Sequence, residues 1–323
     1  MDSVTRPELK ISAIVCTYNR AGLLANVLQD LSKQELKKSE YEVLIVDNNS
    51  TDSTRRVAEE FCKSQPNARY VFEARQGNAY ARNAGWTKAS GHYVGYIDDD
   101  CRVPQAWLGT AADIIRAHSP GFLGGPLYPW YIGSKPVWFK DDYGTYRLPL
   151  ETAQILTKGY LFGANMFVRR ALLEQVGDFD TRFGRAGANR GYGGEIGPQI
   201  RVRQSRPAEL FYYSPALAVH HLVQPGAMTL RYRVRERLSM GYSVYGLFHG
   251  NSEGKFGPGQ AALEALWSGG KAALDSMRGI VFRDRVRYPY FQNYFYEHTG
   301  EYFTALGRVY AKYQWTKSTP RLG

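Results

Sequence analysis

The chain of 323 residues has few cysteines and no long apolar run, and both absences exclude classes of protein. Its three cysteines, Cys16, Cys62 and Cys101, lack metal-ligand spacing and cannot build a disulfide framework, so a reducing cytosol is the expected compartment. No stretch approaches the roughly 18 apolar residues that a membrane-spanning helix needs. The polar segment from Met1 to Lys10 contains no apolar signal-peptide region.

Acidic residues are also in deficit, with 30 Asp and Glu against 41 Lys and Arg, which gives a net charge of +11. A basic chain favours anionic partners such as nucleotide phosphates, nucleic acid or an acidic membrane surface. Two nucleotide-binding motifs are missing as well. No G-x-G-x-x-G follows the first predicted strand, which disfavours a dinucleotide oxidoreductase, and there is no P-loop.

Apolar strands and amphipathic helices alternate through the first hundred residues. Strands are predicted over 11–16, 41–46, 70–73 and 93–98, and helices over 23–31, 53–63 and around Arg82 and Asn83. The run Val43 to Val46 is continuously apolar, as in a strand buried on both faces. This alternation predicts an α/β fold with a mostly parallel, doubly wound sheet.

The strand that begins at Tyr93 ends in three consecutive carboxylates, Asp98, Asp99 and Asp100. Adjacent acids repel one another and are costly to desolvate unless a cation neutralises them. The carboxyl ends of strands in open α/β sheets are where ligands bind. Hard carboxylate oxygens suit Mg²⁺ or Mn²⁺, and such ions commonly bridge to phosphates. The alternative is a solvated acidic turn that caps the helix expected after Pro104.

The second half of the chain is less regular. Residues 126–160 form a long segment rich in Pro, Gly, Tyr and Trp, and segments of this kind are often lids or binding loops. Its aromatic residues could stack on sugar rings and form one side of a site for an acceptor sugar (an acceptor wall), or they could form a local core. The sequence leaves both open for Trp130, Trp138, Phe139 and Tyr143. Residues 185–194 hold four glycines and are expected to be flexible.

From about Met228 the chain is expected to be mostly helical, with a Gly-rich linker over 250–260 and a basic, aromatic tail from Arg283. We therefore predict two parts. Residues 1–225 form the first part, and residues 226–323 form a helical basic and aromatic region.

Four sequence blocks together resemble the family-2 glycosyltransferases of the GT-A fold, over about residues 10–225. The order and spacing of the blocks carry this resemblance: Ile14 to Arg20, Val46 to Asp52, Gly77-Asn78 with Ala81 to Gly85, and Ile97 to Asp100. The resemblance implies a GT-A sheet flanked by helices that binds a nucleotide-sugar across the carboxyl ends of the first strands. It thereby implies that residues 1–225 are the catalytic, nucleotide-sugar-binding domain.

The donor-binding residues that the resemblance implies follow the first, second and fourth strands or lie on the third helix. Asp47 is implied to accept a hydrogen bond from the imide N–H of the base, and its alternative role is to cap the next helix. Arg82 is implied to steady the phosphates or the base. The full set is Thr17, Tyr18, Asn19, Arg20, Asp47, Asn49, Arg82, Asp98 and Asp99.

The resemblance also implies a divalent metal, Mn²⁺ or Mg²⁺, at the Asp-x-Asp pattern of Asp98 and Asp100. Asp99, between them, is implied to face the ribose or the sugar, and the sequence does not decide which of the three acids ligates the ion. His221, in Val219-His220-His221-Leu222-Val223, fits the family spacing for a third ligand, with His220 as its rival. Imidazole suits Mn²⁺ better than Mg²⁺.

Inverting transfer needs a general base to deprotonate the acceptor hydroxyl. Glu195, after Gly193 and Gly194, occupies the family position of this base, whereas the usual second acid is replaced by Ile196. Its alternative role is to cap a helix. Asp178 and Asp180 are the fallback acids.

The prediction is a metal-dependent inverting glycosyltransferase that moves a sugar from a nucleoside diphosphate donor, with UDP favoured, to a saccharide or lipid-linked acceptor in polysaccharide or glycoconjugate synthesis. The alternative is a non-catalytic relative that binds a nucleotide-sugar or glycan in a polysaccharide assembly. A nucleic-acid or membrane-surface binder ranks last, because a basic surface does not explain the acid triplet, and no nucleic-acid partner is expected. The expected location is cytoplasmic, with peripheral contact at the inner membrane face as a narrower hypothesis.

Overall fold

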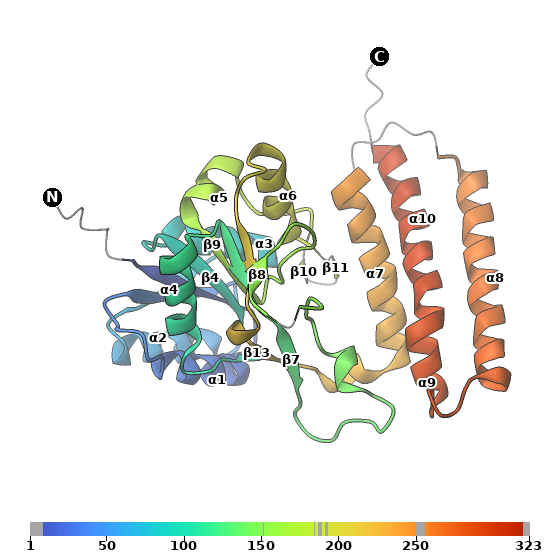
Figure 1. Cartoon of the computed structure of the whole chain (residues 1–323), viewed down its shortest axis with the longest axis horizontal. Helices are drawn as coiled ribbons and strands as arrows, with labels where there is room; N and C mark the ends of the chain where they lie inside the picture. Colours follow the sequence, from blue (N-terminus) through green and yellow to red (C-terminus); the bar gives the residue numbers. More distant parts are fainter. Residues whose placement is uncertain are drawn as a thin grey trace, which may run out of the picture. The chain divides into compact units, whose positions relative to one another are not determined.

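A parallel four-stranded layer begins the fold. The computed structural model describes residues 9–150, 152–183, 185–186, 189–190, 193–249 and 256–318. β1 pairs with β2 and β4, and β2 pairs with β3, all in parallel. The carboxyl ends of these strands therefore meet at one edge of the sheet. The elements of this first part are β1 (Ile11–Thr17), α1 (Ala21–Ser32), β2 (Tyr41–Asp47), α2 (Thr54–Ser64), β3 (Ala68–Phe72), α3 (Asn78–Lys88) and β4 (Tyr93–Asp98) (Figure 1).

Further strands extend this layer to an eight-stranded sheet in the order β3-β2-β1-β4-β9-β6-β12-β8. β9 runs antiparallel between β4 and β6, and four of the seven pairings in the sheet are parallel. The prediction of an α/β fold with a mostly parallel sheet is confirmed. The added elements are β5 (Cys101–Arg102), α4 (Trp107–His118), β6 (Phe122–Gly124), β7 (Leu127–Trp130), β8 (Gln154–Ile155), β9 (Asn165–Arg169), α5 (Arg170–Val176), α6 (Ile196–Ser205), β12 (Phe211–Tyr213) and β13 (Val219–Leu222).

Helices cover both faces of the sheet. Because side chains alternate along a strand, Ala13 and Val15 of β1 pack in the cluster that holds α1, α2 and α4, whereas Ile14 packs in the cluster that holds α3, α5 and α6. Each fully buried Leu or Ile in these clusters contributes about 1.5–3 kcal/mol by leaving water. The two layers hold the carboxyl edge of the sheet rigidly.

A buried polar network stabilises the other edge of the parallel layer. Glu42 accepts hydrogen bonds from Ser12 Oγ at 2.6 Å and from the Ser90 N–H and Oγ at 2.6 and 2.7 Å, and it pairs with Arg69 at 2.8 Å. Burial by itself would raise the pKa of Glu42, but the hydrogen bonds from Ser12, Ser90 and Arg69 outweigh it and lower that pKa to about 2. Glu42 therefore ties β1, β2, β3 and the start of β4 together in its ionised form.

Two apolar stretches in the second half of the first unit enter the sheet only in part. The apolar stretch from Leu161 to Arg169 enters the sheet only at Asn165, because the Asn165 N–H bonds to the Phe162 carbonyl and closes a turn. The stretch from Phe211 to Val219 is interrupted after Tyr213 by a 3₁₀ turn over Pro215–Leu217, whose N-cap is Ser214. Local backbone turns override the apolar pattern in both places.

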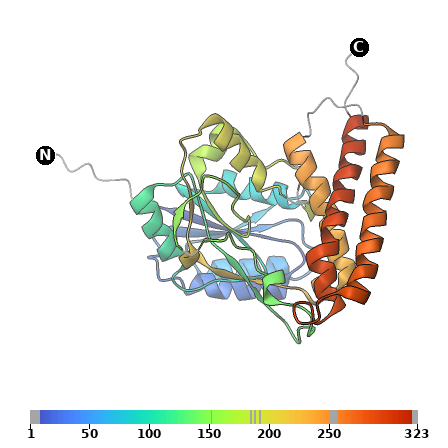
Figure 2. The same ribbon diagram turned by 45° about the vertical axis from the view of Figure 1, so that its right-hand side comes forward.

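The chain divides into two compact units, the first formed by residues 1–130, 144–182 and 194–222 and the second by 131–143, 183–193 and 223–323. In the second unit, α10 lies between α7 and α8 (Figures 1 and 2). Its elements are a 3₁₀ turn (Asp141–Tyr143), β10 (Arg185–Ala186), β11 (Asn189–Arg190), α7 (Leu230–His249), α8 (Pro258–Phe282), α9 (Phe291–Tyr294), a π-helical turn (Phe295–Thr299) and α10 (Gly300–Ser318).

Aromatic residues of the irregular segment form the core of this second unit. Trp138, Phe139 and Tyr143 are buried together with Val223 and Met228. This packing supports the local-core interpretation of the three aromatic residues over an acceptor wall.

No helix in the described part of the chain is long and apolar enough to cross a membrane. Two predictions lie partly outside the described residues. They concern the flexible segment over 185–194, of which 187–188 and 191–192 are not described, and the linker over 250–260, of which 250–255 are not described. The last residues of that expected linker, from Pro258, already belong to α8.

Candidate functional site

The acid triplet ends β4 at the carboxyl edge of the sheet. Asp99 and Asp100 are buried, at 4% and 5% exposure, and Asp98 is partly exposed. The guanidinium of Arg20, from the loop after β1, donates to Asp99 Oδ1 at 2.8 Å and to Asp100 Oδ2 at 2.9 Å. The triplet is therefore not a solvated turn, because two of its members are withdrawn from water and share one cation.

Burial dominates the electrostatics of this group. It raises the pKa of Asp99 to about 7, with Arg20 opposing the rise and the charge of Asp100 adding to it. Burial alone would lower the pKa of Arg20, but the neighbouring charges of Asp99 and Asp100 outweigh it and raise that pKa. One guanidinium thus only partly compensates the clustered acids.

His221 completes a three-residue cluster beside the triplet. β13 pairs antiparallel with β5, which places His221 opposite Cys101, the residue directly after the triplet. His221 Nε2 lies 3.3 Å from Asp100 Oδ1 and 3.9 Å from Asp98 Oδ2. Because side chains alternate along a strand, His220 points to the other face of β13, where its ring lies 6.3 Å from that of Tyr128. Of the two rival histidines, the structure brings only His221 to the acids.

The donor atoms of Asp98, Asp100 and His221 all lie within 4.8 Å of one another, a spacing that could hold a metal ion. Asp100 Oδ1 is buried and has no hydrogen-bond partner in the described part of the chain, although it faces the cluster. A buried carboxylate oxygen without a partner is costly unless a ligand satisfies it. Two carboxylates and one imidazole suit Mn²⁺, and also Mg²⁺ with a weaker match at the imidazole. These residues therefore fit a divalent ion.

A second charged group adjoins the cluster. Arg82 projects from α3, is 6% exposed, and lies 3.7 Å from Asp98 and 3.5 Å from Glu195. Burial would lower the pKa of Arg82, but the charges of Glu195 and Asp98 raise it overall. Glu195 occupies the N-cap position of α6, and its side chain is 24% exposed. Glu195, Arg82, Asp98 and His221 thus form a continuous row, in which each side chain lies within 4 Å of the next.

Gly163 provides the room for this arrangement. A Cβ at Gly163 would lie 2.7 Å from Arg82 Nη2 and 3.0 Å from both Arg82 Cζ and Glu195 Cβ. These separations are shorter than those that carbon atoms normally allow. Only a residue without a side chain fits here with both Arg82 and Glu195 in place.

The loops after β1 and β2 are joined by hydrogen bonds between their polar residues. Asn19 Oδ1 accepts from the Thr51 N–H at 2.7 Å, and the Asn19 N–H donates to Ser50 Oγ at 2.9 Å. Both Asn19 and Asn49 have positive φ, 51° and 65°, which asparagine tolerates better than most residues. Asn19 therefore fixes the rim of the site, while Asn49 is exposed on it.

Asp47 is buried at the end of β2 and accepts two hydrogen bonds. Its Oδ1 accepts from the Ser50 N–H and its Oδ2 from the Tyr70 hydroxyl, each at 2.9 Å. It caps the turn before α2 rather than the helix, which begins at Thr54. Nearby, Thr17 is buried and Tyr18 is 44% exposed.

A comparison with known families bears on this geometry. The sequence profile described as "Glycosyl transferase family 2" matches residues 12–177, just over half of the chain. The chain belongs to glycosyl transferase family 2. The matched range contains β2 to β4, all of β1 except Ile11, and the acid triplet, so the predicted family is confirmed.

Curated relatives include several named glycosyltransferases. Glycosyltransferase AglE of Haloferax volcanii is 30% identical over 170 residues, which are 52% of this chain and 55% of that protein. The GalNAc(5)-diNAcBac-PP-undecaprenol beta-1,3-glucosyltransferase of Campylobacter jejuni is 32% identical over 103 residues, 31% of this chain and 33% of that protein. The matches thus span about half or less of these two relatives.

Solved structures share the fold at lower identity. The mannosyltransferase PcManGT of Pyrobaculum calidifontis, in complex with GDP-Man and Mn²⁺, aligns with a TM-score of 0.62 at 18% identity and covers 94% of this chain and 87% of its own. TarS 1–349 of S. aureus, in complex with UDP-GlcNAc, aligns with a TM-score of 0.53 at 17% identity, covering 96% and 91%. The GT-A fold expected from the family-2 resemblance is confirmed.

Two members of this family-2 site were not found from the sequence. Gly163 lies on the turn before β9, and Tyr70 of β3 reaches Asp47 through its hydroxyl. The sequence leaves Trp130 open between a sugar contact and a local core, and in the structure its indole N–H donates to the Asp100 carbonyl at 3.0 Å and thereby supports the triplet. Neither Gly163 nor Tyr70 belongs to a sequence block of the family. Both join the site through contacts with residues that are distant in the sequence, and the sequence alone does not predict such contacts.

The two fallback acids are engaged in structural contacts. Asp178 accepts from the Trp86 indole at 3.1 Å, and Asp180 pairs with Arg182 at 2.6 Å. Asn83 binds the backbone of Phe179 between them through both its amide atoms, which fixes the turn to α3. Of the three candidate acids, Glu195 is the one that pairs with Arg82. Arg82 in turn pairs with Asp98 of the three-residue cluster.

Proposed function

We propose that this family-2 chain is a metal-dependent inverting glycosyltransferase. It transfers a sugar from a nucleoside diphosphate-sugar, with UDP favoured, to a saccharide or lipid-linked acceptor in polysaccharide or glycoconjugate synthesis. The observation that carries the proposal is the cluster of Asp98, Asp100 and His221 at the carboxyl edge of the sheet, in which one buried carboxylate oxygen has no hydrogen-bond partner among the described residues.

Asp98, Asp100 and His221 would hold Mn²⁺ or Mg²⁺. When bound, the ion supplies positive charge that stabilises the departing nucleoside diphosphate. A fold neighbour that was solved with GDP-Man and Mn²⁺ supports this assignment. Arg20 keeps Asp99 and Asp100 together while the third residue of the cluster, His221, approaches from β13.

Glu195 is the proposed general base. As the acceptor oxygen forms its bond to the anomeric carbon, the Glu195 carboxylate takes the hydroxyl proton, and the bond to the diphosphate breaks with its electron pair on the leaving group. Arg82, whose guanidinium lies 3.5 Å from the Glu195 carboxylate, positions that side chain. The partial exposure of Glu195 leaves room for an acceptor to reach it.

The donor would lie over the loops that follow β1 and β2. Asp47 can still accept a hydrogen bond from a base, because each carboxylate oxygen has two lone pairs and each now accepts one bond. Thr17, Tyr18 and Arg20 flank the same edge, together with Asn19 and Asn49 on its rim. UDP is favoured by the family resemblance, and TarS 1–349 of S. aureus was solved with UDP-GlcNAc.

Relatives' names favour a lipid-linked acceptor. The Campylobacter jejuni relative is named for a diphospho-undecaprenol acceptor, and a Haloferax volcanii relative, 23% identical over 230 residues, is named glucosyl-dolichyl phosphate glucuronosyltransferase. We therefore infer that a polyprenyl-linked saccharide is the first acceptor class to test.

A thermal-shift screen tests the proposal. UDP, GDP, UDP-GlcNAc and GDP-Man are added with and without Mn²⁺, and we expect one nucleotide class to raise the melting temperature only when Mn²⁺ is present. Asp100→Asn should abolish that rise. Asp113→Asn, the same change at an exposed acid of α4, should leave it intact.

Equal stabilisation of the wild type and Asp100→Asn, or stabilisation that needs no metal, would contradict the metal assignment. Donor binding with normal metal dependence but no transfer to any acceptor of a broad panel would instead favour the non-catalytic relative. The replacement of the usual second acid by Ile196 motivates that alternative.

A further inference from the structure

Helix α8 (Pro258–Phe282) packs with its apolar side outward. The face that contacts α10 and the adjoining turns carries small residues, Ser268, Ala272 and Gly279, which are buried. A Cβ at Gly279 would collide with the ring of Tyr294, so the helix approaches too closely there for any larger residue. The helix thus packs through small side chains and not through its large apolar ones.

The large apolar side chains of α8 are exposed. Six that share one face are between 55% and 73% exposed: Leu263, Leu266, Trp267, Leu274, Met277 and Val281. They recur at intervals of three, four and seven residues, which places them on one face of a helix. A continuous apolar face of this size on a folded unit indicates an interaction surface.

The charged residues of α8 are also divided between its two sides. Both of its acids face the helix bundle, where Glu264 pairs with Lys312 of α10 at 3.2 Å and Asp275 accepts from Tyr294 and Thr299 at 2.9 and 2.7 Å. Both of its basic residues, Lys271 and Arg278, are exposed, and the Lys271 ammonium lies 4.4 Å from the Trp267 ring centre. The outward face therefore carries positive charge only.

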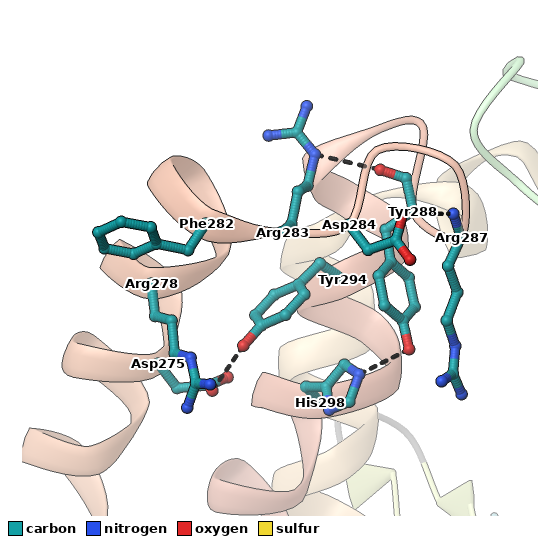
Figure 3. A pocket seen from close by; sticks show the side chains of 9 residues that line it. All are labelled: Asp275, Arg278, Phe282, Arg283, Asp284, Arg287, Tyr288, Tyr294 and His298. Carbon is teal, nitrogen blue, oxygen red and sulfur yellow. Dashed lines mark hydrogen bonds between the residues drawn. The ribbon is translucent and has the colours of Figure 1, made fainter.

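A pocket of about 340 Å³ lies at the C-terminal end of α8 (Figure 3). Its charged lining residues are the cations Arg278, Arg283 and Arg287 and the acids Asp275 and Asp284. Arg283 is held by backbone carbonyls, including that of Tyr288 at 3.1 Å. Arg278 and Arg287 form no ion pair with another residue in the described ranges of the chain, and both are exposed. Two guanidinium groups are thus available to bind anions beside the apolar face.

We propose that α8 docks the protein onto the surface of an anionic phospholipid bilayer. Its apolar face would enter the boundary between headgroups and acyl chains, and Lys271, Arg278 and Arg287 would contact lipid phosphates. A second copy of the chain is a poorer occupant, because face-to-face pairing of this surface would bring Lys271 and Arg278 of both copies together. The helix lies on the bilayer and does not span it, in keeping with its hydropathy.

Vesicle flotation of the full chain tests this surface. We expect retention on vesicles of phosphatidylcholine with phosphatidylglycerol, and little retention on phosphatidylcholine alone. The triple variant Leu266→Glu, Leu274→Glu, Val281→Glu should bind at least about a hundredfold more weakly, since three buried apolar groups become charged. Arg278→Glu should weaken binding roughly tenfold and remove most of its salt dependence.

Val137→Glu is the matched control, because Val137 is 81% exposed but lies outside α8. It should float like the wild type, and circular dichroism should show all variants folded. A blue shift of Trp fluorescence on vesicles that Trp267→Phe removes would locate the contact on α8.

Absence of retention on the anionic vesicles, or equal flotation of the triple variant, overturns the proposal. A dimer in light scattering that the triple variant dissociates, without vesicle binding, assigns the surface to a second copy and also overturns it. The inference does not depend on transferase activity. Metal-dependent donor binding in the thermal-shift screen is read separately, so either proposal can fail alone.

Discussion

The substitution Gly163→Ala tests how the site is held together, because it adds one methyl group and changes no charge. The added Cβ would lie 2.7 Å from Arg82 Nη2 and 3.0 Å from Glu195 Cβ. Ordinary contact for such atoms begins near 3.4 Å. Arg82 and Glu195 must therefore move apart by several tenths of an ångström, and the guanidinium cannot retreat freely because it is buried next to Asp98.

The cost should fall on turnover more than on stability. A guanidinium at the end of a long side chain can shift, so we expect a loss of about 1 kcal/mol in the free energy of unfolding, at the low end for overpacking. A misplacement of about 1 Å in a reacting group lowers rates by about a hundredfold, so a shift of several tenths of an ångström should lower kcat by roughly tenfold. The proposed metal ligands Asp100 and His221 are not among the atoms nearest to that Cβ, so Mn²⁺ affinity should change less than threefold, or about 0.7 kcal/mol.

Three measurements check this pattern: kcat with the donor and acceptor that the screens identify, Mn²⁺ affinity by calorimetry, and unfolding by urea. Gly109→Ala in α4 is the matched control, because a Cβ there meets nothing within 4 Å. It should leave kcat unchanged and stabilise the helix by about 0.5–1 kcal/mol. Wild-type kcat in Gly163→Ala, or an equal loss in Gly109→Ala, would refute the reasoning.

Three further predictions concern single side chains. His221→Ala should weaken Mn²⁺ binding by roughly 10–100-fold, whereas His220→Ala should not, as calorimetry would reveal. Glu195→Gln should lower kcat at least about a hundredfold with donor affinity retained, and unimpaired transfer would disprove the base assignment. Glu42→Gln should unfold about 3 kcal/mol more easily at pH 7, because the pKa of Glu42 is about 2 in the folded chain, against an ordinary value of 4.5. That difference should be complete above about pH 4.5 and vanish as the pH falls through about 2, and a pH-independent difference in urea unfolding would contradict it.

The first hundred residues indicated much of the fold. Alternation of apolar strands with amphipathic helices is a local signal, and each strand from β1 to β4 lies within two residues of its predicted bounds. The sequence also predicted the importance of the acid triplet, because three carboxylates after a buried strand need a neighbouring positive charge. The source of that charge was predicted only in part: the sequence indicates Arg20 as a site residue, but not its ion pairs with Asp99 and Asp100.

The sequence did not predict which distant elements pack against one another. Arg82 and Glu195 are separated by more than a hundred residues and meet only because α3 and α6 share one face of the sheet. Gly163 matters through its distance to both, and nothing in its own neighbourhood along the chain indicates this. The sequence also did not predict the orientation of α8, because a helical apolar pattern does not show whether the face with large side chains or the face with small ones is buried.

The central claim is that Asp98, Asp100 and His221 hold a divalent ion against the diphosphate of the donor. A crystal soaked with Mn²⁺ and UDP, measured at the manganese absorption edge, tests it most directly. The account predicts an anomalous peak within coordination distance of these three side chains and of the UDP phosphates. A peak elsewhere, or a nucleotide bound away from this edge of the sheet, would contradict it.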